Sequence, residues 1–182
     1  MSEAAADLFE PDIEQTVGGS SLKERMAQRR EEILKNRFYD QDLPGYDGMV
    51  YGRYRLLDGE KLNQIAENVI RTIKAEQKAE RGLAAAIDTL SASLIEIRVR
   101  DEGRDTSLAE HLGEDSPVRF DKKLAEFMDF SDSLGDTPRV RDIVREVFLN
   151  NEVALMAHNQ RLSRWMMSNG VDIQSELMED FA

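Results

Sequence analysis

The sequence predicts a mainly α-helical (α+β) protein: a helical bundle of about six helices with a small antiparallel β element and disordered acidic termini. Three observations predict this fold class. Apolar residues recur at helical spacing through most of the chain, and only two or three short segments alternate apolar and polar residues. Both ends are acidic and contain no lysine or arginine, so they cannot bury enough apolar surface to offset the entropy lost on ordering.

A charged helix is predicted first, from residue 21 to residue 36. Ser21 and Glu24 form a capping box, in which the Ser21 side chain caps the Glu24 amide and Glu24 reaches back. Six bases outweigh three acids between residues 23 and 37, the one basic stretch of an acidic chain. Its apolar residues are too sparse for a core helix, so we expect an exposed arm or a partner-binding helix, with Arg25, Arg29 and Arg30 as contact residues.

A turn, a strand and a helix are predicted next. Residues 42–48 contain one proline and two glycines, which favour a turn. In the strand at 49–56, Val50 and Tyr54 face one side of the sheet, and Arg53 and Arg55 face the other. Asp58 caps the following helix. We expect that helix to bury one stripe, made by Leu62, Ile65, Ala66, Val69, Ile70 and Ile73.

The second half of the chain is predicted to be helical apart from one strand. A helix that buries Leu83, Ile87, Leu90 and Leu94 runs into an alternating strand at residues 95–99 and a turn at 101–104. Residues 105–120 look irregular, with a short extended piece at 118–120. Further helices are expected around residues 124–128, after a Thr137–Pro138 start, and from about residue 151 to a Gly170 cap.

These elements suggest four segments along the chain. We predict a disordered acidic tail over residues 1–20, a charged N-terminal helix or arm over 21–42, a helical core domain with the β element over 43–170, and an acidic C-terminal tail over 171–182.

Composition excludes several classes of function. The formal net charge is −12, with an isoelectric point near 4.7, which disfavours binding to nucleic acid and to anionic membranes. The chain has no cysteine, so disulfides and thiolate chemistry are excluded. No apolar run approaches the ~20 residues of a membrane-spanning helix, and the N-terminus is acidic where a targeting peptide is basic. We therefore expect a soluble protein that stays in the compartment where it is made.

Candidate catalytic residues are few. His111 lies beside Glu110 and Glu114 in a polar segment, where a histidine can act as a base or a metal ligand, but no second ligand follows at suitable spacing. His158 falls on the apolar stripe of the last helix, which favours a hydrogen-bonded core residue. No nucleophile elbow or phosphate-binding loop is present. We expect no enzyme activity, no metal and no cofactor.

The last helix has more apolar surface than one stripe needs. Leu155, His158 and Leu162 share one face, and Val153, Met156 and Met167 lie together on a second. Such a helix is either enclosed in the core or offers one side to a partner, and methionine adapts well to varied contacts. The second face is therefore a candidate partner-binding surface.

Several segments resemble tail assembly chaperones of long-tailed actinobacterial phages. Their shared pattern is a charged N-terminal helix, a "PGY-x-G" turn and an "RYR" strand, which here are residues 44–48 and 53–55. The segments at residues 84–90, 95–101, 117–121, 154–158 and 164–166 are also similar, in the same order. The resemblance covers roughly residues 21–170 and lies in short structural motifs.

The resemblance implies a non-enzymatic role in virus assembly. Such chaperones bind the tape-measure protein, and possibly the major tail-tube protein, in the host cell cytoplasm, and they are not expected in the mature virion. They are commonly made in two forms by ribosomal frameshifting, and this chain fits the short form. A homo-oligomer is possible. The alternatives are a structural minor tail or connector protein of the virion, and a small enzyme or regulator that uses His111 with Glu110 or Glu114.

Overall fold

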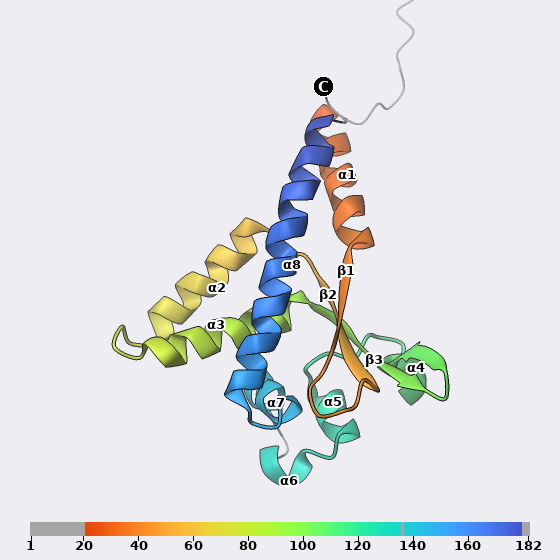
Figure 1. Ribbon diagram of the computed structural model, residues 1–182, viewed down its shortest axis with the longest axis vertical. Helices are drawn as coiled ribbons and strands as arrows, with labels where there is room; N and C mark the ends of the chain where they lie inside the picture. Colours follow the sequence, from red (N-terminus) through yellow and green to blue (C-terminus); the bar gives the residue numbers. More distant parts are fainter. Residues whose placement is uncertain (1–20, 136, 180–182) are drawn as a thin grey trace, which may run out of the picture.

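The computed structural model describes residues 21–135 and 137–179, and within them it has eight helices and four strands (Figure 1). The helices are α1 (Leu22–Asn36), α2 (Gly59–Thr72), α3 (Lys78–Ser93), α4 (Leu108–Leu112), α5 (Lys122–Phe127), α6 (Ser131–Leu134), α7 (Val140–Val147) and α8 (Glu152–Glu179). The strands are β1 (Phe38–Asp42), β2 (Val50–Arg55), β3 (Leu94–Asp101) and β4 (Arg104–Ser107).

The strands form one antiparallel sheet in the order β1-β2-β3-β4. The β3–β4 hairpin closes through Glu102 and Gly103, both at positive φ, as a tight two-residue turn requires. In the centre of β2, Gly52 lets the Tyr54 ring lie against the backbone, because a Cβ at residue 52 would come within 2.6 Å of the Tyr54 hydroxyl oxygen.

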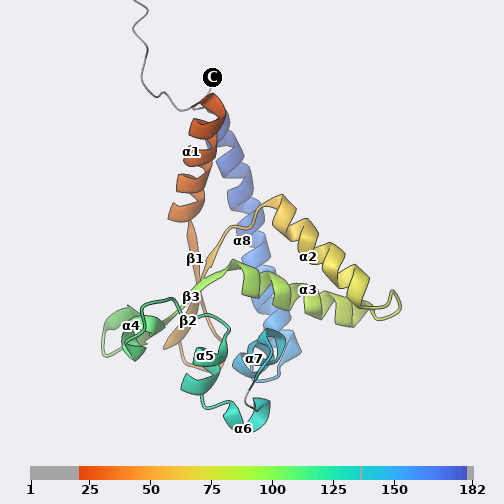
Figure 2. The same ribbon diagram turned by 180° about the vertical axis from the view of Figure 1, so that it is seen from behind.

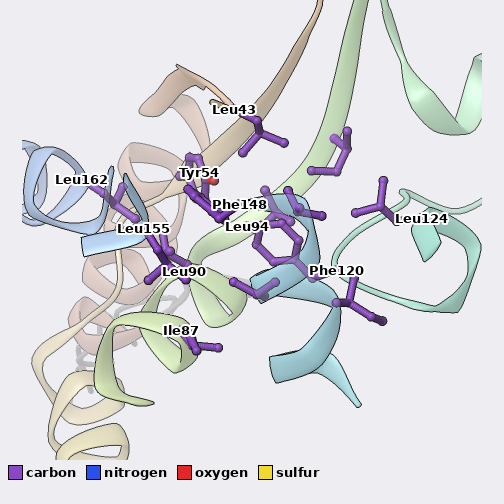
Figure 3. Packing of buried hydrophobic residues seen from close by; sticks show 14 of the residues in the cluster. Leu43, Tyr54, Ile87, Leu90, Leu94, Phe120, Leu124, Phe148, Leu155 and Leu162 are labelled. Atoms are coloured by element: carbon purple, nitrogen blue, oxygen red, sulfur yellow. The ribbon is translucent and has the colours of Figure 1, made fainter. Parts of the chain in front are cut away.

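The two faces of the sheet have opposite chemistry. One face packs against α3, α5, α7 and α8, and Tyr54, Leu94 and Phe148 lie at the centre of this core (Figure 3). The other face carries ion pairs between neighbouring strands: Arg53 with Asp40 at 2.8 Å, and Arg98 with Asp105 at 3.0 Å. This alternation follows from the two-residue period of a strand, and it confirms the predicted sides of β2.

The prediction of a bundle of about six helices with a small β element is wrong. The four-stranded sheet is a full part of the core, so the fold is α+β. The outer strands β1 and β4 were missed because they are short and polar, and because an edge strand with most side chains exposed has no alternating apolar pattern. The predicted irregular stretch at 105–120 likewise begins with β4 and α4.

The predicted end of the last helix is also wrong. α8 passes through Gly170 and continues to Glu179, so most of the predicted acidic C-terminal tail is helical. In Figures 1 and 2, α1 lies beside this second half of α8, which gives it a helical neighbour beyond the core. The predicted N-terminal tail, residues 1–20, and the last three residues lie outside the described residues.

Several other helix predictions are confirmed. The capping box of α1 is present, with both reciprocal bonds between Ser21 and Glu24. Asp58 caps α2, and its side chain accepts from the Lys61 amide at 2.7 Å. The start of α7 differs, because Arg139 stands at its N-cap rather than Thr137.

Candidate protein-binding surface

The face of α8 that points away from the core carries three exposed apolar residues. Leu155, His158 and Leu162 are buried, and at 100° per residue Val153, Met156 and Met167 lie roughly opposite to them. These three side chains are 79%, 41% and 75% exposed. The sequence left open whether this face was enclosed in the core, and the described residues leave it uncovered. We call this surface the outer face of α8.

A groove between α3 and α8 extends the outer face. Its volume is about 900 Å³, and its walls come from the first turns of both helices. The α3 wall is low, because Ala79 and Gly82 have little or no side chain, and a Cβ at residue 82 would meet nothing within 4 Å. Val153 and Met156 are the large apolar residues of the α8 wall, which also includes Glu152, Ala157, Asn159, Gln160 and Ser163. A shallow apolar channel beside an exposed helix face suits a helical partner.

The groove also contains one unsatisfied polar atom. Asn159 lines the groove, and its side-chain oxygen is buried without a hydrogen-bond partner among the described residues. Buried acceptors of this kind normally have a partner.

The middle of α8 is fixed by side-chain contacts on the side of the helix that faces the core. Trp165 stacks on Tyr39 of β1, with ring centres 5.3 Å apart, and Asn169 accepts from the Arg37 guanidinium at 3.3 Å. His158 is fully buried against the Phe148 ring. Because the inner face is held in this way, the outer face is presented by a rigid helix.

His158 is neutral in this environment. Burial, and then the nearby positive charge of Arg161, lower its pKa to about 3. The Gln41 amide oxygen faces the ring and accepts from Nδ1 at 3.1 Å, which leaves Nε2 to accept from the Tyr54 hydroxyl at 3.0 Å. All three groups are therefore satisfied by one tautomer, as expected for the hydrogen-bonded core histidine predicted from the sequence.

The predicted basic contact residues lie elsewhere. Arg25 and Arg29 are exposed on α1, and Arg30 is on the same helix. α1 runs beside the second half of α8, whereas Val153 and Met156 lie at its start (Figure 1). The structure therefore brings Val153 and Met156 together in the groove, but it does not bring the arginines to them.

His111, the other candidate from the sequence, lies on α4. Its ring is exposed and meets Phe127 edge-on, with ring centres 6.2 Å apart. Glu114, one of its possible partners, forms an ion pair with Lys123. Residues 21–135 and 137–179 contain no group of three or more histidine, aspartate and glutamate side chains suited to a metal ion.

One exposed apolar surface, on α2, was not predicted from the sequence. The stripe of α2 was predicted to be buried, but only Ile65, Val69 and Ile73 are, and Leu62 and Ile70 are 37% and 60% exposed. Periodicity shows that a helix has an apolar side, but not how much of that side a neighbour covers.

The groove between α3 and α8 was not predicted from the sequence either. The pattern that could have indicated it is the pair of small residues Ala79 and Gly82, three positions apart on one helix.

Comparisons with known proteins identify no relative. No family model matches the chain, and no curated protein or solved structure is significantly similar to it. None of the described helices has the length and apolar character needed to cross a membrane.

Proposed function

We propose that this chain is a non-catalytic assembly chaperone that binds a helical client through the outer face of α8. The client is the tape-measure protein of a long-tailed phage, and the chaperone assists tail-tube assembly. The observation that carries the proposal is the exposure of Val153, Met156 and Met167 on a helix whose opposite side is firmly packed.

A chaperone that keeps a client soluble must meet particular physical requirements. A long helical client exposes apolar stripes until its partners cover them, and a chaperone must cover those stripes reversibly. Methionine side chains are flexible and adapt to different client sequences, and the net charge of −12 keeps the complex soluble. The sequence resemblance to tail assembly chaperones supports the identity of the client.

Co-expression tests the proposal. The chain is produced together with the tape-measure protein of the same genome, and the client is quantified in the soluble and insoluble fractions. We expect the intact chain to move most of the client into the soluble fraction. The double variant Val153→Lys, Met156→Lys should lose this effect, because two charges would have to be desolvated on binding.

Ile70→Lys is the matched control, since Ile70 is equally apolar and 60% exposed but lies on α2. It should keep the rescue. If the intact chain leaves the amount of insoluble client unchanged, the proposal is refuted. If all variants rescue the client equally, the binding surface lies elsewhere on the molecule. Mass spectrometry of purified virions decides against the alternative of a structural tail protein if the chain is absent from them.

A further inference from the structure

Two methionine side chains lie on the outer face of α8. Met156 and Met167 are 41% and 75% exposed, and at 100° per residue they lie about 20° apart around the helix axis. Met156 also lines the groove, together with Val153. Because the chain has no cysteine, these thioethers are the most readily oxidised groups on this surface.

Burial separates these two residues from the methionine beside them in the chain. Met166 directly precedes Met167, but its side chain packs in the main core and is only 7% exposed. A dissolved oxidant reacts most readily with thioethers that solvent reaches. The outer face is therefore oxidised before the core.

We propose that Met156 and Met167 form a reversible modification site, at which a peroxide converts both thioethers to sulfoxides and so closes the outer face to apolar partners. Each conversion is a two-electron oxidation of sulfur. One peroxide oxygen forms the new S–O bond, the O–O bond breaks, and the other oxygen leaves as water with both protons. Methionine sulfoxide reductases reverse the change.

A sulfoxide changes the polarity of the surface more than its shape. The thioether is apolar and flexible, whereas the sulfoxide oxygen is a hydrogen-bond acceptor that water solvates. Burying that oxygen against an apolar stripe without a donor costs free energy. After both oxidations only Val153 remains as a large apolar side chain of the three, so apolar partners should bind about tenfold more weakly or worse.

The fold should survive this modification. Met156 and Met167 are exposed, whereas α8 is held through the side that faces the core, where Leu155 and Leu162 are buried. Oxidation of Met166 differs, because it would place a polar oxygen in the core. Mild and prolonged oxidation should therefore separate the loss of binding from the loss of stability.

Peptide mapping tests the modification site. The intact chain is treated with hydrogen peroxide for increasing times, and tandem mass spectrometry measures the oxidised fraction of each methionine. We expect Met156 and Met167 to be oxidised roughly five times faster than Met166 or more. The urea midpoint should be unchanged at that stage. Equal rates at the three residues, or oxidation of the exposed pair only after unfolding, would overturn the proposal.

Retention on a phenyl matrix tests closure of the outer face without a client. The background variant Met26→Leu, Met49→Leu removes two other exposed methionines, which lie on α1 and in the turn before β2. Mild oxidation of this variant should make it elute earlier, and reductase treatment should restore the retention. Adding Met156→Leu and Met167→Leu gives the matched control, which keeps every remaining methionine and should not shift on oxidation. Equal shifts in both variants, or no shift, would refute the site.

Client binding gives the regulatory test, and this role alone rests on the proposed function. Denatured tape-measure protein is diluted into oxidised or unoxidised background variant, and its precipitation is followed by light scattering. The oxidised protein should be needed at about ten times the concentration to keep the client soluble. Equal protection by both forms refutes the switch. If the unoxidised form gives no protection, the chaperone proposal fails, whereas the phenyl-matrix result still decides the modification site.

Discussion

At the scale of single residues, the core accepts polar groups only where each is paired. His158, Tyr54 and Gln41 satisfy one another in the centre of the molecule, between β1, β2 and α8. The place of His158 on a helical stripe predicted its buried, hydrogen-bonded environment correctly. Its partners could not be predicted in the same way, because Gln41 lies on a strand that has no apolar pattern.

The free energy of unfolding should decrease as the pH is lowered, because of His158. The folded pKa of about 3 lies below the unfolded value near 6.5, so the unfolded chain binds the proton first and stability is lost as pH falls below 6.5. Between pH 7.5 and 5.5 we expect a loss of about 1.4 kcal/mol from this group. Urea unfolding at the two pH values measures it.

Two variants isolate the contribution of His158. His158→Gln should lack this part of the pH dependence, whereas His111→Gln, at an exposed position, should keep it. In NMR spectra the ring signals of His158 should stay constant from pH 8 to pH 5. A ring that titrates near pH 6.5 would contradict the buried neutral state.

The glycine in β2 should be intolerant of even one methyl group. In Gly52→Ala the new Cβ would lie 2.6–2.7 Å from three atoms of the Tyr54 ring and hydroxyl, so the buried ring must move. We expect the free energy of unfolding to fall by roughly 1–3 kcal/mol, as for other overpacked cores. Gly59→Ala, where nothing lies within 4 Å, should change it little.

At the scale of elements, the Asp58 cap should contribute measurably to the stability of α2. Asp58→Ala removes the acceptor of the Lys61 amide and should cost about 1 kcal/mol, whereas Asp58→Asn should retain most of the cap. Urea unfolding of both variants measures the difference. Equal losses for alanine and asparagine would show that the charge of Asp58, and not the capping bond, stabilises the helix.

The elements also show what sequence patterns can and cannot predict. The stripe of α3 and the core side of β2 were correct, because their predicted residues, among them Ile87 and Leu90 of α3 and Val50 and Tyr54 of β2, are all buried in the main core. The end of α8 was wrong, because a glycine after a run of apolar residues has the same pattern as a helix cap. The second apolar face of α8 was predicted from its spacing, and Val153, Met156 and Met167 are exposed on it.

At the scale of the whole molecule, two cores of unequal size divide the fold. The main core joins the sheet to α3, α5, α7 and α8, whereas a second, small cluster of Val69, Ile73 and Ala84 joins α2 to α3. Long-range arrangements of this kind depend on contacts between distant segments, which is why the sequence predicted most of the longer helices but only part of the sheet around which they pack. α2 therefore occupies the edge of the molecule (Figure 2).

This division predicts that α2 opens before the rest of the molecule. Few buried contacts hold it, so its amides should exchange through local opening, at a free energy on the order of 2 kcal/mol or more below that of α3. Hydrogen exchange with mass spectrometry at low urea measures both helices in one experiment. Val69→Ala should lower protection in α2 and leave Ile87 and Leu90 of α3 protected, whereas Ile70→Ala, at an exposed position, should affect neither. If α2 and α3 exchange at the same free energy with the same urea dependence, the two cores unfold as one unit, and the α2 surface is then as firmly held as the outer face of α8.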